Sequence, residues 1–103
     1  LKKRVAARTV VDQLYRDILA RPADEEAIKL YGRALEEGKS VENVRKMIAF
    51  SPEAGLVIND RFKKFTGREA TEPEMMKVRK ELNEGGTIAQ LESKLAKHGR
   101  KLK

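Results

Sequence analysis

Apolar residues recur at matching places in two stretches of the chain, residues 10–49 and residues 57–96, which are offset by 47 positions without a gap. Apolar positions and glycines both correspond, and the pairs are Val11 with Ile58, Tyr15 with Phe62, Leu35 with Leu82, Gly38 with Gly85, Val44 with Leu91 and Ile48 with Leu95. Self-similarity at a fixed period indicates one structural unit used more than once. We call the two stretches the first repeat and the second repeat.

The apolar spacing of the first repeat predicts three helices. The first should cover about residues 3–19, because apolar residues recur there every three or four positions. Pro22 ends it, and Asp24 is placed to cap a second helix that stops at Gly38. Ser40 then caps a short third helix. The predicted inward positions of this third helix are Val41, Val44, Met47 and Ile48.

The second repeat has corresponding residues at its expected helix starts and ends. Ser51 followed by Pro52 predicts the start of a fourth helix, which Gly67 ends. Two capping boxes are expected at the starts of the fifth and sixth helices, and they pair Thr71 with Glu74 and Thr87 with Gln90. Gly85 and Gly86 separate these two helices, and Gly99 is expected to end the last one.

These elements predict an all-α fold within a single domain, residues 1–103. Nothing in the pattern is typical of a strand, and the short connections favour antiparallel neighbouring helices. Stacked arrays usually need at least three repeats, and this chain has two. We therefore expect the repeats to close into one six-helix bundle of two tandem three-helix repeats, followed by a basic tail, residues 99–103.

Charge is concentrated at the two ends of the chain. The net charge of the 103 residues is +7. Residues 1–8 and residues 94–103 contain nine of the basic side chains and no acidic one, so the part between them is close to neutral. The basic character therefore belongs to the termini and not to the repeats.

Composition narrows the classes of protein. There is no cysteine, which excludes disulfides, zinc fingers and a thiol nucleophile. No apolar run approaches the roughly 18 residues that a membrane span needs, and no signal peptide is recognisable. The chain begins at Leu1 and not at Met, which fits either a processed product or a part of a longer protein.

Arg21 and Arg68 occupy equivalent places just after the first helix of each repeat. Each guanidinium is suited to satisfy carbonyl groups at that helix end, or to pair with Asp24 in the first repeat and with Glu72 in the second. Binding of an anionic ligand is the other interpretation, and the sequence leaves it open. Tyr15 and Phe62, which also correspond, are expected in the core.

No residue set in the sequence is typical of catalysis, of a metal site or of a cofactor. His98, the one histidine, has no neighbouring nucleophile or second ligand, and we expect it to be a solvated side chain near a helix end. The acidic runs at residues 24–26 and 36–37 lack the spacing of a calcium loop. Gly85 and Gly86 do not follow a strand, so they are not a phosphate loop.

The stretch from Leu14 to Asp24, LYRDILARPAD, is similar to a family signature that continues through Leu35, Gly38 and Ser40 to Ser51-Pro52-Glu53. It resembles a bacterial helical repeat, domain-of-unknown-function family 4214, over about residues 10–96. The chain departs from that family at Ala20, where glycine is usual. The second repeat has that glycine, followed by arginine, but has Glu69 and Thr71 in place of the proline and aspartate.

The resemblance implies a function without catalysis. Members of the family occur in secreted calcium-binding proteins, in surface-layer proteins and beside glycosyltransferases, and a similar helical region anchors a surface layer to cell-surface polysaccharide. A more distant similarity is to the repeat of phycobilisome linker polypeptides, which thread through acidic light-harvesting discs. The resemblance thus allows a secreted or cell-surface bacterial protein, and the sequence alone does not fix the compartment.

Two functions follow as hypotheses. The first is a non-enzymatic interaction or scaffold module that attaches to a protein or polysaccharide partner, with basic termini that steer it to an acidic surface. The alternative is a small nucleic-acid-associated protein that binds phosphates through its termini, without sequence specificity. The candidate binding residues are Lys2, Lys3, Arg4, Arg8, Arg21, Arg68, Lys97, Arg100, Lys101 and Lys103. Whether the protein is a monomer or an oligomer is left open.

Overall fold

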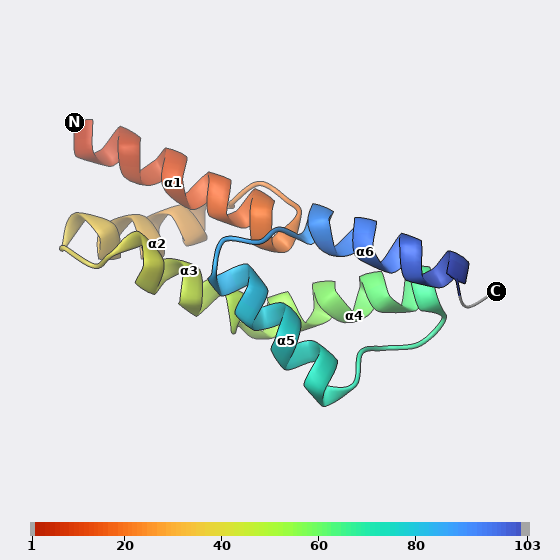
Figure 1. Ribbon diagram of the computed structural model, residues 1–103. Coiled ribbons are helices and arrows are strands. Elements are labelled where there is room, and N and C mark those ends of the chain that lie inside the picture. Colours follow the sequence, from red (N-terminus) through yellow and green to blue (C-terminus); the bar gives the residue numbers. More distant parts are fainter. Residues whose placement is uncertain (1, 102–103) are drawn as a thin grey trace.

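The computed structural model describes the backbone of residues 2–101 and the side chains of residues 6–97. This part of the chain is all-helical, without a strand (Figure 1). Its helices are α1 (Lys2–Leu19), α2 (Glu25–Glu36), α3 (Val41–Ala49), α4 (Pro52–Thr66), α5 (Glu72–Asn83) and α6 (Ile88–Lys101). The all-α class predicted from the apolar pattern is therefore confirmed for this part of the chain.

Side-chain caps fix the helix starts where the sequence predicts them. Asp24 accepts a hydrogen bond from the backbone N–H of Ala27, and Ser40 and Ser51 make the equivalent bonds at α3 and α4. Both predicted capping boxes are formed. Their reciprocal bonds join Thr71 with Glu74 and Thr87 with Gln90. The helix starts are thus determined by contacts three residues apart along the chain.

The helix ends repeat as well. Gly38 and Gly85 follow α2 and α5 with φ of +106° and +108°. At the ends of α1 and α4 the equivalent residues are Ala20 and Gly67, which are left-handed at +56° and +83°. The first repeat therefore places a Cβ where glycine is favoured. At the other end of the chain, α6 continues through Gly99 to Lys101, so the helix end predicted at Gly99 is wrong. A glycine is tolerated inside a helix at a cost of about 1 kcal/mol.

The core contains nearly all the predicted apolar positions. Its fully buried large side chains are Val11, Leu14, Ile18, Val44, Ile48, Ile58, Leu82 and Ile88. Two predictions for α3 are wrong, because Val41 is 37% exposed and Met47 is 42% exposed. Val41 is the first residue of its helix, where few neighbours surround it, and Met47 lies one position before the buried pair Ile48 and Ala49.

The helices form an elongated body with extents of 53 × 20 × 19 Å (Figure 1). The extended pair α1 and α2 lies toward one end, and α4 and α6 lie side by side toward the other. Contacts of α3 with α5, and of α1 with both α4 and α6, join the two repeats through one continuous core. The start of α1 and the end of α6 consequently lie at opposite ends of the molecule.

The second helix of each repeat is placed differently. Helix α2 lies along α1, whereas α5 contacts α3 more than it contacts α4. Small residues face α1 in the first arrangement, where Ala27 and Gly32 are buried and a methyl group on Gly32 would make an ordinary contact of 3.9 Å with the Cβ of Ala7. The residue equivalent to Gly32 is Arg79, and the residue equivalent to the buried Ala27 is Glu74. Larger, charged side chains on this face of α5 prevent it from lying as closely on α4.

Candidate functional site

Arg21 is a joint between the repeats. Its guanidinium donates two hydrogen bonds to Glu53 of α4, with Nε–Oε2 at 2.6 Å and Nη2–Oε1 at 2.9 Å. It also donates to the Pro22 carbonyl and lies 4.9 Å from the centroid of the Tyr15 ring. Asp24, the partner expected from the sequence, contributes a longer contact of 3.6 Å. These contacts support the structural interpretation of Arg21 over a ligand-binding one.

The electrostatics around Arg21 follow from these contacts. The hydrogen bonds from Arg21 hold the pKa of Glu53 below its usual range. Burial raises the pKa of Tyr15 to about 12, since the Tyr15 ring packs beside Tyr31 with centroids 6.2 Å apart. The first repeat therefore has its interhelical space filled by two aromatic rings beneath an ion pair.

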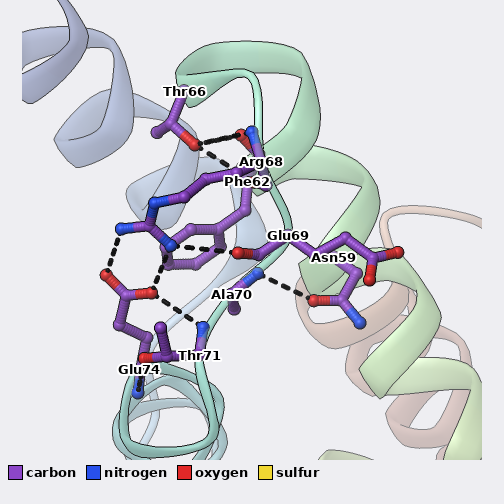
Figure 2. Close-up of polar contacts among 8 residues, drawn as sticks. All are labelled: Asn59, Phe62, Thr66, Arg68, Glu69, Ala70, Thr71 and Glu74. Atoms are coloured by element: carbon purple, nitrogen blue, oxygen red, sulfur yellow. Dashed lines mark hydrogen bonds and ion pairs between the residues drawn. The ribbon is translucent and has the colours of Figure 1, made fainter.

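Arg68 takes a different partner in the second repeat. Figure 2 shows its guanidinium facing the carboxylate of Glu74, with bonds of 2.8 Å and 3.0 Å, and donating to the Glu69 carbonyl. The sequence suggested Glu72 as the partner. The actual partner is the third residue of α5, whose carboxylate also accepts from the backbone N–H of Thr71. Arg68 and this N–H together lower the pKa of Glu74 to about 2.

Two further contacts set the path between α4 and α5 (Figure 2). The side chain of Asn59 accepts a hydrogen bond from the Ala70 backbone N–H at 3.0 Å. Asp12 makes the same bond to Ala23 in the first repeat, also at 3.0 Å. Thr66 donates to the Phe62 carbonyl at the end of α4. The turn after the first helix is thus held alike in both repeats, and the difference in packing arises beyond it.

A cavity of about 410 Å³ opens between α4, α5 and α6. Its apolar wall is formed by Phe62, Val78, Leu91 and Leu95, and its polar rim by Thr66, Arg68, Glu74, Lys77, Glu81 and Lys94. We call it the α5 cavity. The cavity exists because α5 leans toward α3, which leaves the apolar side chains of α4 and α6 without a helix directly above them.

Acidic and basic side chains form pairs on the rim of the α5 cavity. Two acidic residues, Glu74 and Glu81, are held by Arg68 and by Lys94, the latter at 3.2 Å. Lys77 is exposed on the same rim. A mixed rim with a small basic excess surrounds an apolar wall, which is the usual chemistry of a site that binds an amphipathic ligand.

The first repeat fills the equivalent space. Tyr31 stands where the second repeat has Val78, and Leu19 stands where it has Thr66. Leu19 is buried, and the Tyr15 and Tyr31 rings pack together at this place between α1 and α2. The α5 cavity is consequently a property of the second repeat, and it arises from substitutions at positions whose helical pattern is otherwise the same.

The basic candidates do not converge on one surface. Arg8 pairs with Glu25 at 3.1 Å and so connects α1 to α2, while Lys97 is exposed on α6. Lys2, Lys3 and Arg4 lie on the first turns of α1, and Arg100 and Lys101 on the last turn of α6, with side chains outside the described residues. Lys103 and the side chain of His98 are also outside them. Because the two ends of the body are opposite, these groups form two separate basic regions.

Sequence reasoning missed Arg79 and the α5 cavity. Arg79 donates to the carbonyls of Ala49 and Ser51, both at 2.9 Å, and so satisfies the end of α3 from α5. An arginine in a half-buried helical position, matched by a glycine in the other repeat, was the available signal. It indicates that the two helix pairs differ, but it does not say where the arginine reaches.

The comparisons add no relative. No family model, no curated protein and no solved structure matches this chain. Among the described residues no helix is long and apolar enough to cross a membrane. Within the same part of the chain, no group of three or more acidic or histidine side chains is placed to hold a metal ion.

Proposed function

We propose that the protein is a non-enzymatic helical interaction module, built as two tandem three-helix repeats, that binds a partner protein through the α5 cavity. The observation that carries this proposal is an apolar wall with a charged rim at a place where the other repeat is filled. The resemblance to the 4214 family agrees with a scaffold or attachment role. The ligand we assign is a peptide segment with an apolar side chain flanked by carboxylates.

The chemistry of the cavity favours a peptide over a polysaccharide. Sugar rings are usually bound against aromatic faces, and Phe62 is the one aromatic side chain in a wall that is otherwise aliphatic. The aliphatic wall of Val78, Leu91 and Leu95 is suited to an apolar side chain. Lys77 on the rim and Lys97 further along α6 are suited to pair with carboxylates of the partner. Such exposed charges contribute more to the rate and specificity of association than to its affinity.

Selection of displayed random peptides on the immobilised full chain tests this function. We expect enrichment of sequences in which one or two apolar residues are flanked by Asp or Glu. The double variant Lys77→Glu, Lys97→Glu should weaken binding of the selected peptides by about tenfold or more, given the usual cost of opposing charges. The matched control Lys29→Glu, Lys46→Glu makes the same charge change at two exposed positions of α2 and α3 outside the cavity lining, and should leave binding intact.

Binding of other classes of ligand to the same immobilised chain distinguishes them from a peptide. Bacterial surface polysaccharide retained at high salt, with no enriched peptide, would replace the peptide by a glycan. DNA or RNA retained only at low salt, and lost on trimming residues 1–8 and 94–103, would favour the nucleic-acid alternative. Equal peptide binding by the control and by the double variant would remove the α5 cavity as the site.

A further inference from the structure

A second apolar surface lies at the opposite end of the molecule. A groove of about 400 Å³ runs between the start of α1, the end of α2 and the start of α3. Its apolar residues are Ala6, Ala7, Val10, Leu35 and Val41. We call it the head groove. It accounts for the exposure of Val41 and the incomplete burial of Leu35, two residues that the apolar pattern places inside.

The equivalent surface of the second repeat is covered. Ala54, Leu82 and Ile88 correspond to Ala7, Leu35 and Val41. All three are at most 1% exposed. What covers them is the first repeat, because α3 packs on α5 and the far part of α1 packs on α4 and α6. The fold therefore shows which kind of surface fits a head groove, namely the outer side of the first and third helices of a repeat.

The second repeat presents its own version of that covering surface. Ile18 and Ile48, which are fully buried in the first repeat, correspond to Phe65 and Leu95. Phe65 is half-buried and lies at the free end of α4. One molecule thus carries the head groove at one end and the half-buried Phe65 at the other, where Leu95 stays 7% exposed in the wall of the α5 cavity.

We propose that the head groove binds the α4–α6 end of another molecule of this protein, head to tail. Such a contact is heterologous, so each association leaves a free groove and a free end. The average mass should therefore keep rising with concentration and not level off at a dimer. This inference concerns the head groove and does not rest on the function proposed for the α5 cavity.

Charge sets an unusual salt dependence for this contact. The groove is lined by Glu36, Glu42 and Lys39, but residues 2–8 beside it carry four basic side chains, so head-to-tail docking still brings a net positive end near the basic residues 94–101 of the other molecule. Inside the chain, Arg21 pairs with Glu53 across the equivalent contact, but the residue equivalent to Glu53 in the head groove is Ala6. Without that ion pair and with like charges facing, association should be weak at low salt. Added salt screens the repulsion, so association should tighten.

Sedimentation equilibrium of the full chain tests the proposal. From about 10 µM to about 1 mM protein, the weight-average mass should rise continuously, and more steeply at about 500 mM than at about 50 mM salt. Val41→Gln places an amide in the groove without adding charge and should weaken association by about tenfold. Leu30→Gln, at a residue 64% exposed on α2 and outside the groove, should leave it unchanged.

Two further arms keep the test decisive. Ala6→Gln changes an exposed groove residue on α1, so it tests the same surface if Val41→Gln disturbs folding. A small fraction of either groove variant added to the unchanged protein should lower the average mass, because such a molecule has an end but no groove and stops growth. A monomer at every concentration and salt, a plateau at the dimer, or equal association by all variants would overturn the proposal. Leu95 belongs both to the α4–α6 end and to the α5 cavity, so peptide binding is measured at a protein concentration too low for association, where the groove variants leave the cavity lining unchanged.

Discussion

The helix pairs α1–α2 and α4–α5 have corresponding helix starts and ends but pack differently. In both pairs an alanine N–H in the turn donates a hydrogen bond to a side chain of the first helix. The second helix of each pair starts after an N-cap residue. In the first pair, Ala27 and Gly32 let α2 lie on α1. In the second, Glu74 and Arg79 occupy these positions, and α5 leans on α3. Turn chemistry fixes where helices start, while side-chain volume on the facing surface fixes where they lie.

The difference has a consequence for function. In the first repeat Tyr15 and Tyr31 fill the part of the space between α1 and α2 that corresponds to the α5 cavity, and a smaller pocket of about 250 Å³ lies further along these two helices. A repeat whose second helix leans toward the other repeat, as α5 does, has the α5 cavity at its surface, although the apolar residues of the wall stay at most 7% exposed. Differences at a few facing positions thus give two segments with the same helical pattern different packing between their helices.

The largest expected effect is a difference in stability loss when each of two equivalent leucines is shortened to alanine. Leu82→Ala should cost roughly 2–5 kcal/mol, because Leu82 is 1% exposed and its loss leaves a cavity in the core. Leu35→Ala should cost clearly less, since Leu35 is only partly buried beside the head groove. Urea unfolding followed by circular dichroism measures both. Equal losses would mean that the head groove is closed in solution.

The second effect concerns the bridge from α5 to α3. Arg79→Met keeps the aliphatic stem but removes the donors to Ala49 and Ser51, so two partly buried carbonyls lose a partner. A loss of about 1–3 kcal/mol in the free energy of unfolding is expected. Arg33→Met makes the same change at an exposed position of α2 and should stay within about 0.5 kcal/mol of the unchanged protein. A neutral Arg79→Met would show that α5 is held by apolar contacts alone.

How far the sequence could anticipate this molecule depends on the range of each interaction. The caps at Asp24, Ser40 and Thr71 involve residues three apart, so the sequence predicts them directly. The bond of Arg79 to Ala49 spans 30 residues, and that of Arg21 to Glu53 spans 32. Such bonds depend on how helices meet, which periodicity does not encode. The α5 cavity also depends on how the helices meet, so the pattern that matched Leu91 with Val44 and Leu95 with Ile48 did not predict the space beside them.

A smaller effect tests the left-handed residues that end α1 and α4. Gly67→Ala puts a Cβ at φ of +83° and should cost about 1 kcal/mol. Ala20→Gly removes the Cβ at φ of +56° and so relieves backbone strain. This relief should slightly exceed the larger entropy that glycine loses on folding, so the free energy of unfolding should rise by at most about 1 kcal/mol. Thermal and urea unfolding of both variants give the two signs. Changes of the same sign at the two positions would show that the helix ends are not equivalent.

The smallest effect is a titration that only the second repeat has. Glu74 has the pKa of about 2, lowered by Arg68 and the Thr71 N–H, whereas the equivalent residue, Ala27, does not titrate. An unfolded Glu has a pKa near 4.3, so between about pH 4.3 and pH 2 the unfolded chain binds the proton more readily. The stabilisation from this carboxylate is therefore present above about pH 4.3 and is lost as the pH falls toward 2.

The exposure of the Arg68–Glu74 pair makes its share of stability small, because water and salt screen the interaction. A site-specific reading is therefore needed, and NMR titration of the Glu74 carboxyl group gives one. In Arg68→Gln its pKa should rise toward the usual Glu value but stay below it, since the bond from Thr71 remains. Arg16→Gln, which removes the partner of Asp12 in the first repeat, should leave the Glu74 titration unchanged. If Glu74 titrates alike in both variants, Arg68 is not its partner in solution, and the rim of the α5 cavity has a free guanidinium to offer an acidic ligand.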